Sequence, residues 1–237
     1  MKAIIFDLDD TLYDCNYTNN GASVEAVCEY TAKELLHLPA DKVRHAFDTA
    51  RMSLKDTIIG DVAAQHNRML YFQKTLELLG YLPISYSLEM YDYFWNDFLG
   101  RISLYPGAKK LLEEMRSRGV QIGICTDMTV HIQHRKLRAL GIDRLIDVLV
   151  TSEEVGVEKP NPAIYQCVLD KLGVNAEEAV YVGDSLEKDV KGPIRMGMKG
   201  IWYVDETVTK KQTTPVEGIV CARNYQELAA ILTQNCL

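Results

Sequence analysis

The sequence predicts an α/β protein with a doubly wound, mainly parallel sheet and an inserted all-helical domain. A continuous apolar run at residues 3–8 has the length of a short buried strand. From about residue 107 onward, short apolar runs alternate with amphipathic segments of helical length, which is typical of a parallel sheet with helices on both faces. Residues 15–104 interrupt this alternation with helical patterns and no convincing strand. We therefore predict a core of residues 1–14 and 105–237 and a helical insertion at 15–104.

Glycine and proline mark the boundaries of several predicted elements. Pro106-Gly107 opens a helix that Gly119 ends, and Asn161-Pro162 is a typical helix start, a capping residue followed by a first-turn proline. The remaining predicted core elements are strands at 120–125, 147–150, 179–182 and 200–204, and helices at 129–140, before residue 197 and at 225–234. The helices expected in the insertion lie near 20–37, 41–55, 61–79 and 88–99.

Composition and charge limit the classes of partner. The 237 residues are 47% apolar and 25% charged, which suits a globular protein with one full core and a smaller second module. The net charge of −7 argues against nucleic acid as a partner, because a polyanion needs a basic surface. A small phosphorylated metabolite, held by a metal ion and a few local donors, remains compatible with this charge.

The sequence gives no indication of a membrane or secretory protein. No run approaches the roughly 18 apolar residues of a transmembrane helix, and the first apolar run is too short for a signal peptide. The six cysteines are scattered without a C-x-x-C pair, as expected for free thiols in a reducing cytosol. We expect a cytoplasmic protein that does not contact a membrane. We also expect a monomer or a homodimer, with the aromatic run at residues 91–95 as the candidate dimer surface.

Three acidic residues follow the first predicted strand, in the segment Asp7-Leu8-Asp9-Asp10-Thr11. Alternate residues of a strand point the same way, so a turn at this position is able to aim Asp7 and Asp9 into one site. Asp10 suits such a turn, because aspartate tolerates a left-handed backbone better than most residues. A solvated turn or a helix cap explains the same cluster when it is considered alone.

Polar residues also follow other predicted strands of the core. Each of them has an ordinary structural explanation, either a helix cap or a surface charge. Taken together, however, they all lie at or just beyond the carboxyl end of a predicted parallel strand, where α/β sheets place their ligand sites. In chain order these residues are Thr126 and Asp127, Lys159, and Asp184, Ser185 and Asp189.

This ordered set resembles the four motifs of the haloacid dehalogenase superfamily. The matching segments are Asp7-x-Asp9-x-Thr11, Thr126, Lys159-Pro160 and Gly183-Asp184-x-x-x-x-Asp189. The helical insertion is similar to the small helical cap of that superfamily, and the core would then be Rossmann-like. The segment from Gly183 to Gly192 is similar to the subgroup that contains N-acylneuraminate-9-phosphatase and related phosphatases.

The resemblance implies a phosphatase that hydrolyses phosphomonoesters in two displacements through an aspartyl phosphate on Asp7. Asp9 would protonate the leaving group and then deprotonate the attacking water. Thr126 and Lys159 would bind phosphoryl oxygens, and Asp127 lies in the same substrate-binding loop. The resemblance also implies Mg²⁺ as cofactor. Its implied ligands are Asp7, Asp184 and the backbone carbonyl of Asp9, with Asp189 and Ser185 in supporting positions.

Two features depart from the family pattern or lie outside it. Asp127 stands where the family usually has Asn or Gly, which adds a carboxylate near the phosphate pocket. In the insertion, a polar helix face is the favoured interpretation of His66, Asn67 and Arg68, and a reach toward the site is the alternative. For His131 and His134, a surface helix is favoured over a metal site, because no third ligand of a suitable type is evident.

Three alternative functions share parts of this pattern. A 2-haloacid dehalogenase has the same nucleophile, but it has no use for Asp9 as a proton donor because halide leaves unassisted. A sugar-phosphate mutase shares both Asp7 and Asp9, and the segment Asp10-Thr11 favours hydrolysis over it. The third alternative is a non-catalytic module. A regulatory module that accepts phosphate on aspartate is usually about half as long and has no such insertion, and a binding protein on this fold would be expected to lose a motif residue, whereas all are present here.

Overall fold

The computed structural model describes residues 1–205, 214 and 216–234, and its centre is a parallel sheet. Within the described residues, the sheet has six strands in the order β3-β2-β1-β4-β5-β6, and every neighbouring pair is parallel. The strands are β1 (Ala3–Phe6), β2 (Gln121–Thr126), β3 (Val148–Thr151), β4 (Ala179–Gly183), β5 (Lys199–Tyr203) and β6 (Val220–Ala222). This topology confirms the predicted α/β class with a doubly wound parallel sheet.

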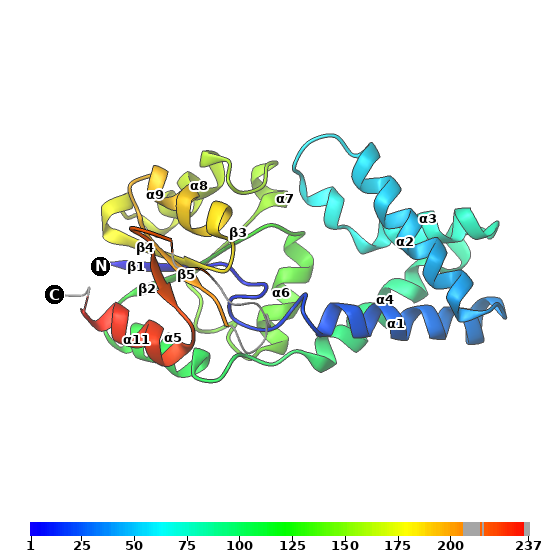
Figure 1. The fold of residues 1–237 in the computed structure, drawn as a ribbon, viewed down its shortest axis with the longest axis horizontal. Coiled ribbons are helices and arrows are strands. Elements are labelled where there is room, and N and C mark those ends of the chain that lie inside the picture. Colours follow the sequence, from blue (N-terminus) through cyan, green and yellow to red (C-terminus); the bar gives the residue numbers. More distant parts are fainter. Residues whose placement is uncertain (206–213, 215, 235–237) are drawn as a thin grey trace.

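Helices cover both faces of the sheet (Figure 1). One face packs against α5 (Ala108–Ser117), α6 (Val130–Ala139) and α11 (Tyr225–Gln234), and the other against α8 (Pro162–Leu172). The strands alternate between these faces: Ile4 and Phe6 belong to the first apolar layer, and Ala3 and Ile5 belong to the second. The remaining short core helices are α7 (Ser152–Val155), η3 (Ala176–Glu178), the π-helical η4 (Leu186–Lys191) and α9 (Gly192–Arg195).

The register of the strands aligns the starts of the loops that follow them. Phe6, the last residue of β1, lies opposite Ile124 of β2 and Val182 of β4. The backbone N–H of Asp7 still donates to the carbonyl of Val182, at 2.9 Å. Because the strands are parallel, the residues just beyond their carboxyl ends meet at one edge of the sheet.

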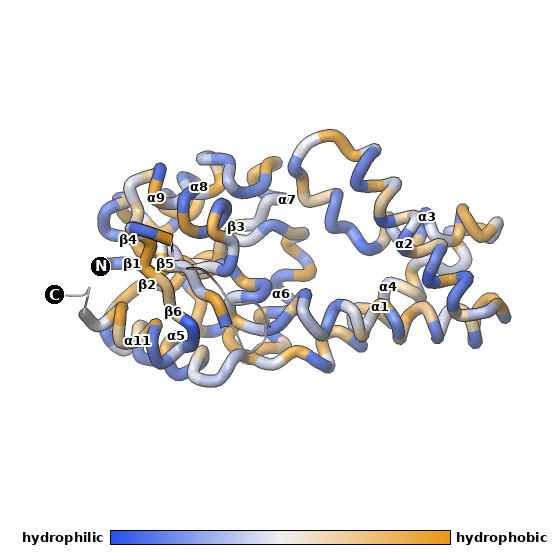
Figure 2. The backbone as a smooth tube through the Cα atoms, viewed as in Figure 1, coloured by the Kyte–Doolittle hydropathy of each residue, from blue (hydrophilic) through white to orange (hydrophobic). Residues whose placement is uncertain are grey.

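Residues 15–104, which we call the cap, form helices and no named strand in the structure. They comprise α1 (Asn19–Tyr30), the π-helical η1 (Thr31–Leu36), α2 (Ala40–Thr57), η2 (Ala63–His66), α3 (Arg68–Leu79) and α4 (Pro83–Arg101). Figure 1 shows them beside the core, beyond the strand ends. In Figure 2 these helices alternate between hydrophobic and hydrophilic residues, as expected of helices that bury one face. The division of the chain into separate core and cap domains stays a prediction.

The two segments that connect cap and core run side by side. Tyr105 N donates to the carbonyl of Leu12 at 2.9 Å, and Tyr13 forms an antiparallel bridge with Leu104. One apolar cluster continues across this junction, from the sheet through Ile132 of α6 to the aromatic residues of α4. The buried aromatic residues of α4 are Phe94, Trp95 and Phe98. In the run at 91–95, Tyr91 and Tyr93 are half-buried and Asp92 is exposed, so the expected dimer surface stays a prediction.

Several elements differ from the sequence prediction at their ends. The first strand ends at Phe6 rather than at residue 8. The helix expected over 61–79 is broken, because Asn67 is extended and its side chain caps α3 by accepting from Met69 N at 2.9 Å. Strand β6 was not predicted, since three residues carry too little pattern to be detected. Among the described helices, none has the length and apolar character that crossing a membrane requires.

Candidate active site

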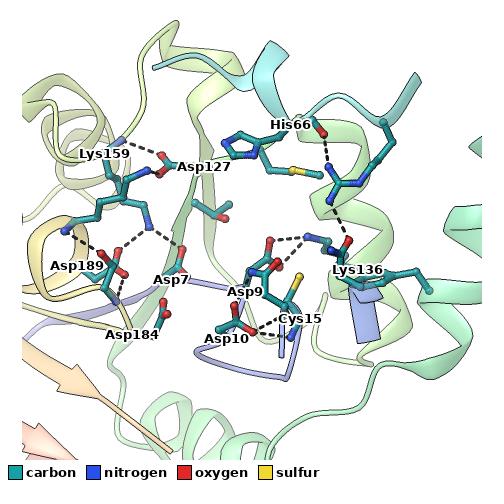
Figure 3. A pocket seen from close by; sticks show the side chains of 18 of the residues that line it. Asp7, Asp9, Asp10, Cys15, His66, Asp127, Lys136, Lys159, Asp184 and Asp189 are labelled. Atoms are coloured by element: carbon teal, nitrogen blue, oxygen red, sulfur yellow. Dashed lines mark hydrogen bonds and ion pairs between the residues drawn. The ribbon is translucent and has the colours of Figure 1, made fainter. Parts of the chain in front are cut away.

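A cavity of about 310 Å³ lies where the carboxyl ends of the central strands meet the cap (Figure 3). The predicted site residues that line it are Asp7, Asp9, Thr126, Asp127, Lys159, Asp184, Ser185 and Asp189. Sequence motifs that are as many as 182 residues apart (Asp7 and Asp189) therefore lie in one place. The roles proposed for these residues stay predictions, and the geometry determines which roles are chemically reasonable.

Asp7 is buried and forms an ion pair with a buried lysine. Lys159 Nζ lies 2.7 Å from Asp7 Oδ1 and 2.7 Å from Asp189 Oδ1. Burial raises the pKa of Asp7 well above its usual value, and Asp189 and Asp184 add to this effect, although Lys159 opposes it. Burial also disfavours the charge of Lys159, but Asp189 and Asp7 outweigh it and raise the lysine pKa. A buried cation is therefore fixed beside the proposed nucleophile.

Asp184 completes a cluster of three carboxylates. One oxygen from each of Asp7, Asp184 and Asp189 lies within 4.8 Å of the others. Burial, together with the charges of Asp189 and Asp10, raises the pKa of Asp184 to about 7. Like-charged carboxylates this close repel one another, and a bound cation would relieve that repulsion.

The donor set fits magnesium, which prefers hard carboxylate oxygens. Both carboxylate oxygens of Asp189 already have partners in the protein, because Oδ1 binds Lys159 and Oδ2 accepts from Ser185 N at 3.0 Å. Asp7 and Asp184 are therefore better placed than Asp189 to hold the ion. The remaining hydrogen bonds of Asp189 and Ser185 fix the loop that carries Asp184, since Ser185 Oγ also accepts from Lys188 N at 3.3 Å.

Asp9 points toward α6 and makes contacts different from those of Asp7 (Figure 3). Lys136 Nζ lies 2.8 and 2.7 Å from its two carboxylate oxygens, and the hydroxyl of Tyr13 donates to Oδ1. Burial disfavours the ionised form, but the charge and hydrogen bonds of Lys136 outweigh it, so the pKa of Asp9 is lowered. In this state Asp9 is a carboxylate, the form that accepts a proton.

The turn between Asp7 and the cap is built around Asp10. This residue has the left-handed backbone that the sequence suggested, with φ of +62°. Its Oδ1 accepts from the backbone N–H groups of Cys15 and Asn16, both at 2.8 Å. Thr11 Oγ1 accepts from Asp184 N at 3.1 Å, which ties this turn to the loop after β4. Asp10 and Thr11 therefore shape the loops that present Asp7, Asp9 and Asp184.

Thr126 and Asp127 follow β2 on the other side of Asp7. Thr126 is buried, and its Oγ1 accepts from Gln133 Nε2 at 2.8 Å. Asp127, the departure from the family pattern, binds protein groups with both oxygens. Oδ1 accepts from Lys159 N at 2.9 Å, and Oδ2 lies 2.9 Å from Lys188 Nζ. Its charge is therefore partly neutralised, and it positions the backbone of the loop that carries Lys159.

Several cavity residues were missed or misread in the sequence, among them Lys136, His66 and Arg68. Lys136 contacts Asp9 from inside the helix predicted at 129–140, and nothing in the local sequence singles out one lysine among several. His66 and Arg68 were assigned to a polar helix face, but both line the cavity. Asn67 between them caps α3. The signal available in the sequence is Asn67, a residue type that caps helices, and its cap separates His66 from α3.

Most of the chain matches one family of hydrolases. The model of the haloacid dehalogenase-like hydrolases matches residues 1–197, so the chain belongs to this family of hydrolases. This membership confirms the family that the ordered motifs predict.

Several relatives are phosphatases. Ribulose-1,5-bisphosphate 5-phosphatase of Halopiger xanaduensis is 38% identical over 85% of this chain and 84% of the relative. Glyceraldehyde 3-phosphate phosphatase of Methanocaldococcus jannaschii is 32% identical over 84% of this chain and 82% of the relative. Human N-acylneuraminate-9-phosphatase, from the subgroup that the sequence suggested, is 26% identical over 98% of this chain and 94% of the relative.

A solved structure agrees with this fold. The crystal structure of a HAD phosphatase from Thermococcus onnurineus has a TM-score of 0.70 and 26% identity, and the match covers 98% of each chain. The expected phosphatase class agrees with these relatives.

Proposed function

We propose that this protein is a magnesium-dependent phosphatase that hydrolyses a small phosphorylated metabolite through an aspartyl phosphate on Asp7. The observation that carries the proposal is the carboxylate of Asp7, which is 2.7 Å from Lys159 Nζ and adjoins Asp184 in the same buried cluster. A nucleophile, a fixed cation and a metal-binding acid thus adjoin one cavity. The relatives act on sugar phosphates or related phosphorylated compounds by their names, which supports a small metabolite as substrate.

In this mechanism the substrate phosphoryl group would lie against Asp7, with Lys159 and Thr126 donating to its oxygens. Asp7 would attack phosphorus, and the bond to the leaving alkoxide would break. Asp9 would have to be protonated when the substrate is bound; it would give that proton to the alkoxide, and the carboxylate so formed would accept one from the water that hydrolyses the acyl phosphate. Magnesium held by Asp7, Asp184 and the backbone carbonyl of Asp9 would neutralise charge on the phosphoryl oxygens. Lys136 would stabilise the ionised form that Asp9 has between the two steps, the form that accepts the proton from water.

The test measures release of inorganic phosphate from an aryl phosphate and from a panel of sugar phosphates, with and without Mg²⁺. We expect turnover that disappears after chelation and returns when magnesium is added. Asp7→Asn should reduce turnover to background, because an amide is not a nucleophile for this step. Phosphate release by the metal-free protein, or by Asp7→Asn checked by mass spectrometry for deamidation, would contradict the proposal. A mutase would transfer the phosphoryl group without releasing it, so free phosphate also excludes that alternative.

A further inference from the structure

The charges around the cavity are divided between core and cap. The acidic residues among the described lining residues all come from the core; they are Asp7, Asp9, Asp10, Asp127, Asp184 and Asp189. The charged lining residues of the cap are all basic: Arg51 and Lys55 of α2 and Arg68 of α3, with His66 beside them. The cap therefore contributes positive charge to the cavity and no carboxylate.

None of these three basic residues forms an ion pair among the described residues; Glu158 favours the charge of Lys55, and Asp9 that of Arg68, only from a longer distance. Arg68 donates only to neutral acceptors, the carbonyl of His66 at 3.2 Å and Asn20 Oδ1 at 3.0 Å, and its buried Nε has no hydrogen-bond partner. No ion pair of the described chain includes Arg51 or Lys55. By contrast, Arg44 on the same helix α2 pairs with both Glu25 and Asp48, at 2.6 and 3.0 Å.

The basic residues also repel one another. Partial burial lowers the pKa of Lys55, and the positive charges of Arg51 and Arg68 lower it further. The guanidinium of Arg68 is held in place by aromatic rings, 5.2 Å from the Tyr71 centroid and 5.6 Å from the Phe94 centroid. The fold already orders and partly dehydrates the Arg68 side chain. Binding of an anion to it therefore loses little further conformational entropy.

Arg51, Lys55 and Arg68 line the cavity from the cap, where the end of a small substrate remote from Asp7 would lie. Figure 3 shows His66, whose carbonyl binds Arg68, across the cavity from Asp184 and Asp189. A substrate with its reacting phosphoryl group beside Asp7 would extend toward the cap. The volume of about 310 Å³ limits the ligand to a small molecule.

We propose that Arg51, Lys55 and Arg68 form an anion-binding subsite for a second acidic group of the substrate, remote from the phosphoryl group that is transferred. The substrate class is thus a small phosphomonoester with a second phosphate or a carboxylate at its other end. This inference rests on the proposed function for the identity of the catalytic end. Its own basis is the set of unpaired cap cations.

The test separates binding from hydrolysis. The ligands are linear alkyl phosphates whose tail ends in a methyl group, a carboxylate or a second phosphate, each in several chain lengths. Their affinities for Asp7→Asn protein with Mg²⁺ are measured by calorimetry, so that the result does not depend on turnover. We expect an anionic tail of suitable length to bind about 10- to 100-fold more tightly than the methyl tail, as for one or two charge-assisted hydrogen bonds. The two acidic tails distinguish a carboxylate from a phosphate as the second group.

Substitution then assigns the preference to these residues. Arg68→Met, Arg51→Met and Lys55→Met, each in the Asp7→Asn background, should reduce the preference for the anionic tail by about tenfold or more. Arg51 and Lys55 are exposed, so their variants should fold even if Arg68→Met does not. Arg44→Met is the matched control, because it removes a paired arginine of α2 that does not line the cavity.

The inference is overturned if methyl and anionic tails bind equally at every length. It is also overturned if the preference survives substitution of both Arg51 and Lys55 together with Arg68. If the preference is present but no phosphate is released by the wild-type protein, the subsite stands and the proposed hydrolysis fails.

Discussion

Asp9, the proposed acid and base, binds Lys136 of α6. Aromatic residues of the cap surround this lysine and so connect Asp9 with the cap. Lys136 is 1% exposed and lies 5.9 Å from the ring centroids of Tyr13 and Trp95. The ring of Phe98 is at 5.8 Å, and both Trp95 and Phe98 belong to α4 of the cap. A cation among aromatic faces is stabilised by their quadrupoles. The aromatic residues of the cap therefore help to hold the group that sets the charge of Asp9.

Substitution of Asp9 tests its proposed role as proton donor and acceptor. Asp9→Asn keeps Asp7 as a nucleophile but removes the proton donor and the later base, so turnover of alkyl phosphates should fall by about 10²–10⁴-fold. The loss should be smaller for aryl phosphates, because a phenolate leaves with less protonation. Aspartyl phosphate on Asp7 should then accumulate and be trapped by hydroxylamine or borohydride. Equal losses for both substrate types without a trapped intermediate would count against the proposed role.

A double-mutant cycle tests whether Lys136 acts through Asp9. Lys136→Met keeps the length of the side chain but removes the charge, and we expect kcat to fall about 10- to 100-fold, the size of one charge-assisted hydrogen bond. If the lysine is a positioning residue for Asp9, adding Lys136→Met to Asp9→Asn should cost little more than Asp9→Asn alone. Losses that multiply fully would show that Lys136 acts independently, and thermal melts of all three variants report any general loss of stability.

The sequence led to much of the site and failed at identifiable residues. Asp7, Asp184 and Lys159 were found because parallel strands bring the ends of distant segments together, which motif order alone is able to reveal. Lys136 was not found, because its function depends on where α6 crosses the site and not on its neighbours in the chain. The partners of Asp127, Lys159 N and Lys188, were likewise hidden, since they depend on how two loops pack.

Two helical glycines differ in the space around them. Gly192 of α9 packs against α8, and a Cβ at this position would lie 2.7 Å from Cζ of Tyr165. The hydroxyl of Tyr165 donates to the carbonyl of Lys188 in η4, the segment that also carries Asp189. Gly100 of α4, by contrast, has no neighbouring atom within 4 Å of such a Cβ.

Alanine should affect stability in opposite directions at Gly192 and Gly100. Gly192→Ala should destabilise the protein by about 1–3 kcal/mol, because the added methyl group displaces the ring of Tyr165 from a packed layer. Gly100→Ala should stabilise it by about 0.5–1 kcal/mol, because alanine restricts the unfolded chain and favours helix. Urea denaturation measures both. If Gly192→Ala has the same free energy of unfolding as wild type, α8 and α9 accommodate the added methyl group without cost.

The elements themselves were predictable to different degrees. Core helices with clear apolar spacing and glycine stops, such as α5 and α8, were located closely by sequence. The cap was harder to read, because the segment between α2 and α3 contains helical residues but folds back over the core. Its Asn67 cap and the contact with the core decide the conformation there, and neither follows from periodicity.

At the scale of the whole molecule, the cap contacts the core at the loop that precedes Lys159. Glu158 N donates to the carbonyl of Asp61 at 3.0 Å, and Glu158 Oε1 lies 2.9 Å from His66 Nε2. The other carboxylate oxygen is 3.4 Å from Lys188 Nζ. Burial disfavours the charge of Glu158, but the hydrogen bond from His66, the charge of this histidine when it is protonated, and Lys188 outweigh it and lower the glutamate pKa.

This lowered pKa makes part of the stability depend on pH in a defined direction. A carboxyl group whose pKa is lower in the folded state than its usual 4.5 stabilises the fold above that pH. The contribution is lost as the pH falls below 4.5 and through the folded-state pKa. We therefore expect Glu158→Gln to lose about 1–3 kcal/mol of unfolding free energy at pH 7, the range for a charge-assisted hydrogen bond to a buried group. Below pH 4.5 the difference from wild type should shrink.

The measurement is urea denaturation of wild type and Glu158→Gln at a series of pH values, read as the difference between the two proteins at each pH. The difference removes the contributions of other acidic groups, which titrate in both proteins. Glu113→Gln on the exposed side of α5 is the control for removing one negative charge. The wild type should also resist proteolysis within residues 58–67 better than Glu158→Gln at neutral pH, because opening of this segment breaks the contact. A difference in unfolding free energy that stays constant from neutral to acidic pH would mean that the charge of Glu158 does not hold the cap against the core.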